Sequence, residues 1–207
     1  MRRINPVVLM RIGNSMCGNR FGFSLGVRRL FRQWIAGIGA LALVICAGAA
    51  ARAQSLEEHD AKAAFVLKLV NFVQWPNEAG QHEIAIGFVG ADATGDALKR
   101  MASGKAVDGK NIAVRRLAAD GDLKSCQVVF VGSSETKNLP AILERLRGTS
   151  VLTVGESEGF GQHGGVVNLL LSGGRIRFEV NPHAAERAHL QISSRLLSLA
   201  TIVADGS

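Results

Sequence analysis

The feature that most constrains the fold of this chain is the alternation of strand-like and helix-like segments in its middle. Ile84, Ile86 and Phe88 alternate with other residues as in a strand, and the wholly apolar run at residues 128–131 suits a buried central strand. The expected strands are residues 83–89, 112–117, 128–131 and 151–154, with helices at 96–102 and 138–147. This alternation predicts an α/β layer with a mainly parallel sheet.

Helix signals also mark the two ends of this region. Ser55 and Glu58 form an S-x-x-E capping box, which opens a helix that Trp75-Pro76 is expected to end. Asn138 is expected to cap the helix at 138–147. Near the carboxyl terminus, Ser193 or Ser194 caps a final helix whose apolar stripe includes Leu196, Leu199, Ala200 and Val203.

The last third of the chain predicts a β-hairpin. Residues 166–171 and 175–180 flank Ser172-Gly173-Gly174, and Asn181-Pro182 then opens a short helix. The predicted fold is therefore a single compact α/β domain. Its mainly parallel sheet is flanked by helices and followed by a C-terminal β-hairpin and a terminal helix.

A basic leader precedes the predicted domain. The first 53 residues contain eight Lys or Arg and no Asp or Glu, and an apolar run at 34–50 ends at the A-x-A site formed by Ala51 and Ala53. This order is typical of a signal peptide, with cleavage at Ala51 and Ala53. The run is also about long enough to span a bilayer, but its Gly- and Ala-rich composition favours cleavage. We expect residues 1–53 to be a leader, starting at Met1 or Met16, and residues 54–207 to form an exported domain.

Removing the leader changes the charge of the protein. The whole chain has a net charge of +7, but 24 minus 8 leaves 16 basic residues against 17 acidic ones, a net charge of −1. A nucleic-acid-binding domain usually keeps a basic patch, so this balance argues against a nucleic-acid partner. Cys17 and Cys46 lie in the leader, so Cys126 is the only cysteine left and an internal disulfide is excluded. We expect it to be a small half-buried side chain.

Motifs for catalysis and metal binding are missing. The five histidines form no H-x-x-x-H pair and no HExxH motif, and Ser133-Ser134 lacks the G-x-S-x-G pattern. The glycine-rich segment 155–165 precedes a strand, lacks a Walker lysine and contains two carboxylates, so it predicts a tight connection rather than a phosphate loop. The sequence therefore predicts no enzyme activity, no cofactor and no metal site.

Two groups of residues suit binding. Arg175, Arg177 and Glu179 share one face of the hairpin and can hold an anionic ligand or an acidic patch of a protein, or can form an ordinary solvated face. Phe72 and Trp75 end the first helix and can close the core or form an interface hot spot. The candidate partner- or ligand-binding residues are Phe72, Trp75, Arg175, Arg177, Glu179, His183, Arg187 and Arg195.

The order of motifs resembles the YfiR family of periplasmic proteins. The resemblance begins with K-A-A-F at 62–65 and N-F-V-Q-W-P at 71–76, and continues through G-F-V-G at 87–90 and G-D-A-L at 95–98. It ends with G-F at 159–160, G-G-V-V-N-L at 164–169, F-E-V-N at 178–181 and L-Q-I-S-S-R-L-L at 190–197. These segments cover nearly all of the expected domain in order.

The resemblance implies a small periplasmic α/β protein, often dimeric, that regulates by binding other proteins. Members repress a membrane-bound diguanylate cyclase by binding its periplasmic sensor domain, which lowers cyclic-di-GMP and affects biofilm formation. Members that act as redox switches use paired cysteines, so the single Cys126 speaks against disulfide control here. Two alternatives stay open: an adaptor for another membrane sensor, and a small-molecule-binding protein whose pocket uses helix ends and the Arg177 face.

Overall fold

The computed structural model describes residues 56–76, 82–90, 93–107 and 109–206. The chain divides into two compact units, residues 1–48 and 49–207, and all described residues lie in the second. The predicted leader with its Ala51 and Ala53 cleavage site lies outside the described residues. So does Ser55 of the predicted capping box.

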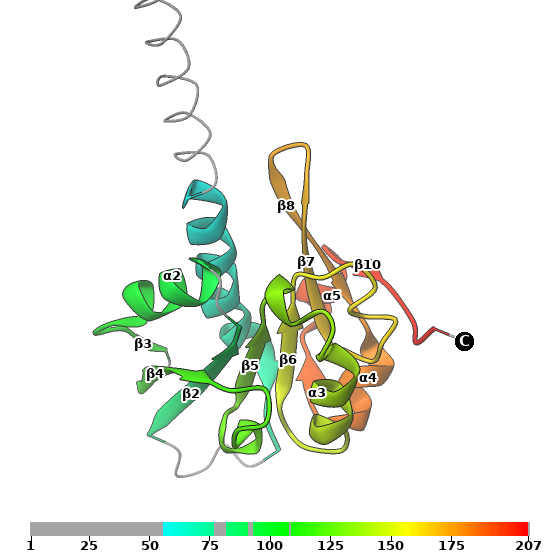
Figure 1. Cartoon of the computed structure of the whole chain (residues 1–207), viewed down its shortest axis with the longest axis horizontal. Coiled ribbons are helices and arrows are strands. Elements are labelled where there is room, and N and C mark those ends of the chain that lie inside the picture. The colour runs from blue at the N-terminus through cyan, green and yellow to red at the C-terminus, as the bar shows by residue number, and fades with distance from the viewer. Residues whose placement is uncertain (1–55, 77–81, 91–92, 108, 207) are drawn as a thin grey trace, which may run out of the picture. The chain divides into compact units, whose positions relative to one another are not determined.

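An eight-stranded sheet forms the centre of the described unit, in the order β10-β8-β7-β6-β5-β2-β4-β3 (Figure 1). The strands are β2 (Glu83–Val89), β3 (Ala106–Val107), β4 (Lys110–Leu117), β5 (Val128–Val131), β6 (Leu152–Gly155), β7 (Val167–Ser172), β8 (Arg175–Val180) and β10 (Thr201–Ile202). Neighbouring strands from β4 through β2, β5 and β6 to β7 are parallel. β8 is antiparallel to β7, β3 is antiparallel to β4, and β10 is parallel to β8. The prediction of an α/β domain with a mainly parallel sheet is confirmed.

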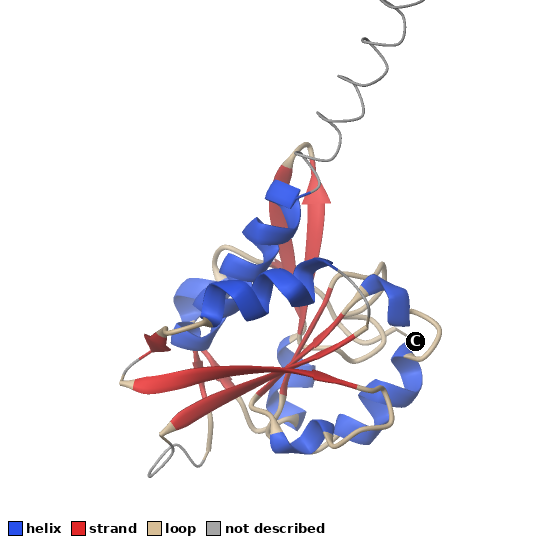
Figure 2. Cartoon of the chain, turned by 60° about the vertical axis from the view of Figure 1, so that its left-hand side comes forward, coloured by secondary structure: helices blue, strands red, loops and turns tan. Residues whose placement is uncertain are grey.

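Helices cover both faces of this sheet (Figure 2). They are a first helix at residues 56–69, α2 (Ala93–Ala102), α3 (Leu139–Leu146), α4 (Pro182–Arg187) and α5 (Ser194–Leu197), with short 3-10 turns at Val70–Phe72, Leu123–Ser125 and Ser133–Glu135. One core contains Val66 of the first helix with Phe88 and Phe130, and the other contains Val129 with Ile142 of α3. Alternate residues of the same strands therefore fill the two cores, as the pleat of a strand requires.

The central strands lie where the apolar runs of the sequence predict them. All four residues of β5 and all four of β6 are buried, which is the expected pattern for parallel strands covered on both faces. Gly173 and Gly174 have φ angles of 59° and 72°, so the turn between β7 and β8 needs residues that accept the left-handed region. The predicted hairpin is confirmed.

The predicted ends of three helices differ from the structure. The first helix does not run to Trp75-Pro76, because Val73–Gln74 form β1 and pair with β9 (Gln191–Ile192). Asn138 precedes α3, but its side chain makes no capping hydrogen bond and donates to Glu135 instead.

The terminal helix is also shorter than expected. It consists of four residues, capped by Ser193, and the chain then forms β10, which pairs with β8. Leu199, which the helical stripe would bury, is 71% exposed. Pairing with a distant strand therefore overrides the local helical pattern at both places.

Candidate partner-binding surface

The order of the strands creates a switch point at the carboxyl ends of β2 and β5. The chain passes from β2 to β4 on one side of β2, and then to β5 on its other side. Connections therefore leave the carboxyl ends of β2 and β5 in opposite directions. Ligands of open α/β sheets bind preferentially at such points.

A cluster of polar side chains fills this edge. The Glu156 carboxylate, which follows β6, accepts from the Lys62 ammonium at 3.0 Å and from the Ser133 amide at 3.2 Å. The Thr94 hydroxyl of α2 lies 3.5 Å from the same carboxylate and 2.8 Å from Nδ1 of His59. We call these five residues the carboxyl-edge cluster. The Glu156 carboxylate therefore contacts the first helix, α2 and the turn after β5, at the place where a ligand would bind in other open α/β sheets.

The buried ammonium of Lys62 is kept charged by the carboxylates beside it. The side chains of Lys62 and Glu156 are only 9% and 3% exposed, and Glu58 contacts Lys62 at 2.6 Å. Burial by itself lowers the pKa of the Lys62 ammonium, but hydrogen bonds to Glu58 and Glu156 outweigh that effect and raise the pKa above its ordinary value. The cluster therefore joins the first helix to the edge of the sheet through a buried ion pair.

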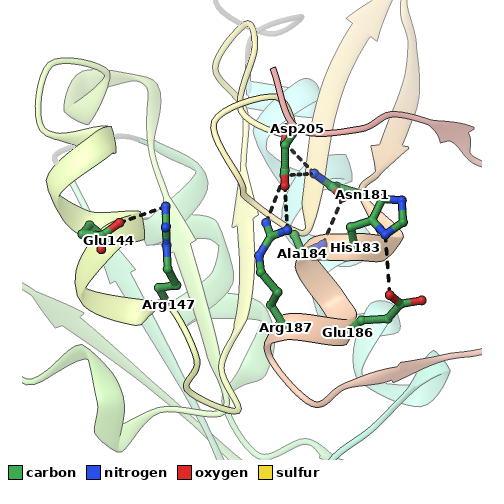
Figure 3. A network of polar contacts seen from close by, with 9 residues as sticks. Glu144, Arg147, Asn181, His183, Ala184, Glu186, Arg187 and Asp205 are labelled. Atoms are coloured by element: carbon green, nitrogen blue, oxygen red, sulfur yellow. Dashed lines mark hydrogen bonds and ion pairs between the residues drawn. The ribbon is translucent and has the colours of Figure 1, made fainter. Parts of the chain in front are cut away.

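A second polar network holds the carboxyl-terminal segment (Figure 3). Asn181, 0% exposed, caps α4 by accepting from the Ala184 amide at 3.0 Å, and its amide group donates to the Gly161 carbonyl at 2.9 Å and to Asp205 at 2.7 Å. Arg187 donates to both carboxylate oxygens of Asp205, at 2.6 and 3.0 Å. These hydrogen bonds raise the pKa of Arg187 and lower that of Asp205. The network therefore ties α4, the 155–165 loop and the chain end together.

A pocket of about 180 Å³ lies beside this network, between α3 and α4. Leu143, Val166 and Ala188 are among its apolar lining residues, while Arg147, His163 and Arg187 contribute polar groups. Figure 3 shows that Arg147 is paired with Glu144, at 2.9 Å. Of the predicted binding residues only Arg187 lines the pocket, and Arg177 does not.

The hairpin presents the predicted charged face. Arg175 and Arg177 are exposed, and their side chains form no ion pair or hydrogen bond with another described residue, whereas the neighbouring Ile176 and Phe178 are partly buried. We call Arg175 and Arg177 the hairpin arginines. Glu179, on the same face of β8, accepts from the Asn168 amide at 3.1 Å.

Asn168 lies opposite Glu179 on β7 and is 1% exposed. Its Oδ1 has no hydrogen-bond partner among the described residues. The base of the hairpin face is therefore polar and closed, and its outer part is charged and open.

The predicted aromatic residues lie at the other end of the sheet. Trp75 and Phe72 are partly buried and pack against the core, and the Trp75 indole donates to the Gln127 carbonyl at 3.3 Å. Gln127 directly precedes β5, at the amino edge of the parallel strands. The hairpin instead extends past the carboxyl edge, because the first residues of β7 pair with the last residues of β6. The aromatic residues and the hairpin arginines therefore belong to different surfaces.

The remaining predicted residues are exposed on short helices. His183 of α4 lies 3.5 Å from Glu186, and Arg195 lies on α5. Among the described residues, the side chains of His183, Arg187 and Arg195 form no hydrogen bond or ion pair with the hairpin face. The structure thus distributes the predicted set over three places: the hairpin, α4 with α5, and the end of the first helix.

The described part of the chain shows no preformed metal centre: no three His, Cys, Asp or Glu side chains within it lie where they can hold a metal ion. Cys126 is buried and free, and burial raises the pKa of its thiol, which makes it a poor nucleophile. None of the described helices is long and apolar enough to cross a membrane.

Sequence reasoning missed the ion pair between Lys62 and Glu156. A signal for it exists, because Lys62 lies four positions before Val66 on the buried side of the first helix, where a charge needs a partner. The partner itself is 94 positions away, in the glycine-rich loop, and no local pattern identifies it. Asp205 was missed for the same reason, since its contacts with Asn181 and Arg187 are also non-local.

Comparison with solved structures gives distant likenesses. A conserved domain protein from Vibrio cholerae O1 biovar El Tor aligns over 70% of this chain and 59% of its own, with 12% identity and a TM-score of 0.49. An ABC domain from Streptococcus pneumoniae, solved in complex with L-Trp, aligns over 58% of this chain and 55% of its own, with 9% identity and a TM-score of 0.45. This chain thus spans less than two thirds of either protein.

A family model gives a much broader match. The model described as YfiR/HmsC-like matches residues 59–201, which contain the first helix from its second turn, all of the hairpin and α4. The matched range includes Lys62 and Glu156 of the carboxyl-edge cluster, and it ends at the first residue of β10. Residues 59–201 are well over half of the chain, and the protein belongs to the YfiR/HmsC-like family.

Proposed function

We propose that this protein is a periplasmic regulator that represses a membrane diguanylate cyclase by binding the periplasmic sensor domain of that enzyme. The observation that carries the proposal is the family match over residues 59–201. YfiR-like proteins are periplasmic regulators rather than known enzymes, and membership is consistent with control of a diguanylate cyclase. Cleavage of residues 1–53 as a signal peptide, with release of the domain into the periplasm, is part of the proposal.

The mechanism is a shift between two states of the cyclase. A protein that binds the inactive state more tightly than the active state increases the inactive population by its difference in affinity. Repression then lowers cyclic-di-GMP, and release of the protein raises it. This mechanism needs a binding surface and no reactive groups on the regulator.

The hairpin is the surface that we assign to this contact. Arg175 and Arg177 are exposed and free to pair with acidic groups, because no other described residue engages them. Trp75 is a weaker candidate, because its indole is partly buried and hydrogen-bonded within the domain. Homodimer formation is compatible with the same role and is a separate proposal.

The signal that releases repression does not involve an internal disulfide. Cys126 is the only cysteine after the proposed leader and is 3% exposed. A single buried thiol has no partner with which to form an internal disulfide. We therefore propose control by a change in binding to the sensor domain itself.

Deletion of the gene in the source bacterium tests this function. Loss of a repressor should raise cellular cyclic-di-GMP, and the full chain supplied from a plasmid should restore the original level. The same plasmid with a C-terminal affinity tag should recover a membrane diguanylate cyclase from detergent-solubilised membranes. If deletion leaves cyclic-di-GMP unchanged and the tagged chain recovers a different membrane sensor, the cyclase is not the target. The protein would then be an adaptor for that other sensor.

The pocket between α3 and α4 favours a second candidate function. Its volume of about 180 Å³ admits only a ligand smaller than a drug-sized molecule, and its lining combines apolar residues with the polar groups of Arg147, His163 and Arg187. A ligand that binds only the folded protein stabilises it, and the stabilisation rises with the logarithm of ligand concentration above the dissociation constant. Concentration-dependent thermal stabilisation by one compound, without any change in cyclic-di-GMP on deletion, would favour the small-molecule-binding alternative.

A further inference from the structure

The outer edge of β8 is only partly covered. β10 pairs with Glu179 and Val180, and no described strand pairs with the outer side of Arg175–Phe178. The Val180 carbonyl accepts from the Val203 amide on this outer side. Backbone groups alternate between the two neighbours of a strand, so Phe178 and Ile176 direct theirs outward as well. The outer half of the hairpin therefore offers a short open strand edge (Figure 1).

Most of the exposed large apolar side chains of the described chain lie on the hairpin or around β10. The described chain has four large hydrophobic residues that are exposed, and three of them belong to β7, to β10 or to the turn before β10: Leu171 at 46%, Leu199 at 71% and Ile202 at 53%. An open edge beside exposed apolar groups is usually protected in soluble proteins, because it can pair with other strands. The exposed charges beside this edge are the hairpin arginines, which disfavour the approach of a strand that carries further cations.

Charge argues against a second copy of this chain at the edge. In antiparallel pairing about Ile176, each Arg175 would lie opposite the Arg177 of the other copy. In pairing about Arg175 or about Arg177, that residue would lie opposite its own copy. The second of these registers would also set Arg175 opposite Glu179, but β10 occupies the edge beside Glu179. In pairing about Phe178, the second copy would have to occupy the edge beside Glu179 and Val180, which already pairs with β10. Like charges directly opposite each other destabilise a strand pair, so every symmetric register that the open edge allows is unfavourable.

We propose that the open edge of β8 adds an extended segment of the partner in which acidic residues alternate with apolar ones. The acidic side chains would face Arg175 and Arg177, and the apolar ones would lie on the face of Ile176 and Phe178. Main-chain hydrogen bonds supply affinity in this mode of recognition, and alternate side chains supply specificity. This inference rests on the proposed function, because the sensor domain of the membrane partner supplies the segment.

A pair of synthetic peptides tests the edge directly. The probe is a blocked hexapeptide of alternating valine and glutamate, titrated into the full chain, expressed with its own leader and purified in the form that the cell produces. We expect saturable binding of this peptide and at least about tenfold weaker binding of the valine–lysine counterpart. Equal binding of both peptides would overturn the selection by charge.

A third peptide separates strand addition from simple ion pairing. It has the valine–glutamate sequence with alternate backbone nitrogens methylated, which removes the hydrogen-bond donors of one edge but keeps all charges. Strand addition predicts at least about tenfold weaker binding of this peptide. Undiminished binding would show that the peptide pairs only through its carboxylates and would contradict the inference.

Variants of the protein place the contact on β8. The double variant Arg175→Glu/Arg177→Glu should lose the valine–glutamate peptide and gain the valine–lysine peptide, while the matched control Lys124→Glu, in the exposed 3-10 turn after β4, should bind as the unchanged protein does. If the double reversal impairs folding, Arg175→Gln/Arg177→Gln removes the same charges without adding new ones. Full binding by that folded neutral variant would overturn the role of the hairpin arginines.

Recovery of the cyclase distinguishes this inference from the proposed function. The tagged full chain and its Arg175→Glu/Arg177→Glu variant are compared for the amount of cyclase they recover from membranes. Loss of recovery in the variant supports the edge as the contact. Equal recovery by both proteins would contradict the edge as the contact but would leave the repressor function standing. Peptide binding without any recovery of a cyclase would support the edge as a binding site and contradict the repressor function.

Discussion

Two regions on the carboxyl side of the sheet differ in whether their charges are paired. In the carboxyl-edge cluster, Lys62 and Glu156 are buried and every charge has a partner within the domain. On the hairpin, Arg175 and Arg177 are exposed and have no partner among the described residues. Buried charges must be paired, because the loss of hydration is costly, while exposed charges keep their water. The closed cluster therefore stabilises the fold, whereas the open hairpin is the surface that we propose for binding.

The largest effect is expected from breaking the closed cluster. Lys62→Met leaves the Glu156 carboxylate buried without its cation, which should lower the free energy of unfolding by about 3 kcal/mol. Urea denaturation measures this loss. The matched control is Lys68→Met on the exposed side of the same helix, which should change stability by less than about 0.5 kcal/mol. Equal losses in both variants would mean that the pairing within the cluster does not matter.

The next effect comes from Asn181, the buried residue of the second polar network. Asn181→Ala removes the cap of α4 and the hydrogen bonds to Gly161 and Asp205, and should cost about 2 kcal/mol. Asn138→Ala is the control, because Asn138 precedes α3 without a side-chain cap. Thermal unfolding of the two variants should therefore differ clearly. A similar change in both would contradict the structural difference between these two asparagines.

An intermediate effect is expected where charges are paired but exposed. The side chains of Arg187 and Asp205 are 41% and 44% exposed, so water screens their attraction and the pair should contribute less than about 1 kcal/mol. Arg187 lowers the pKa of Asp205 in the folded state, so this contribution is present above the ordinary carboxyl pKa and is lost as pH falls below about 4.

Asp205→Asn tests the sign of this dependence. The variant should be less stable than the unchanged protein at pH 7, and the difference should shrink as the pH is lowered from about 4 towards 2. Chemical denaturation at a series of pH values measures both quantities. A stability difference that grows on acidification would contradict the contact with Arg187.

The smallest effect on stability is expected at the hairpin arginines. Arg175→Gln/Arg177→Gln removes two exposed charges whose side chains form no ion pair or hydrogen bond with another described residue, so the free energy of unfolding should change by less than about 0.5 kcal/mol. The same denaturation experiment serves as the measurement. A loss of more than 1 kcal/mol would show that these side chains support the fold, and would end the contrast between the closed cluster and the open hairpin.

Local patterns predicted much of the fold correctly. The strands at 83–89 and 128–131 and the hairpin around Gly173-Gly174 follow from alternation, apolar runs and turn residues. The cap at Asn181 also follows from its neighbours in sequence. For the proposed binding surface, the sequence indicated which side chains on β8 share a face, because residues two apart on a strand lie on the same face.

Other features depended on partners that are remote in sequence. The pairing of β1 with β9 and of β10 with β8 turned two segments with helical patterns into strands. The match between Lys62 and Glu156 joins residues 94 positions apart. Neither kind of contact leaves a periodic signal, because its energy comes from groups that meet only in the folded chain.

The sequence by itself determined the α/β class, the parallel centre of the sheet, the hairpin and the charged face of that hairpin. The tertiary structure decided which charges are closed within the domain and which edge stays open. The physical reason is that propensity and periodicity act over a few residues, whereas burial, ion pairing and strand coverage depend on which distant segments come into contact. The sequence shows Glu156 only as a carboxylate in a loop, because its partner Lys62 is remote in the chain. The open part of the β8 edge depends likewise on where β10 pairs with that strand.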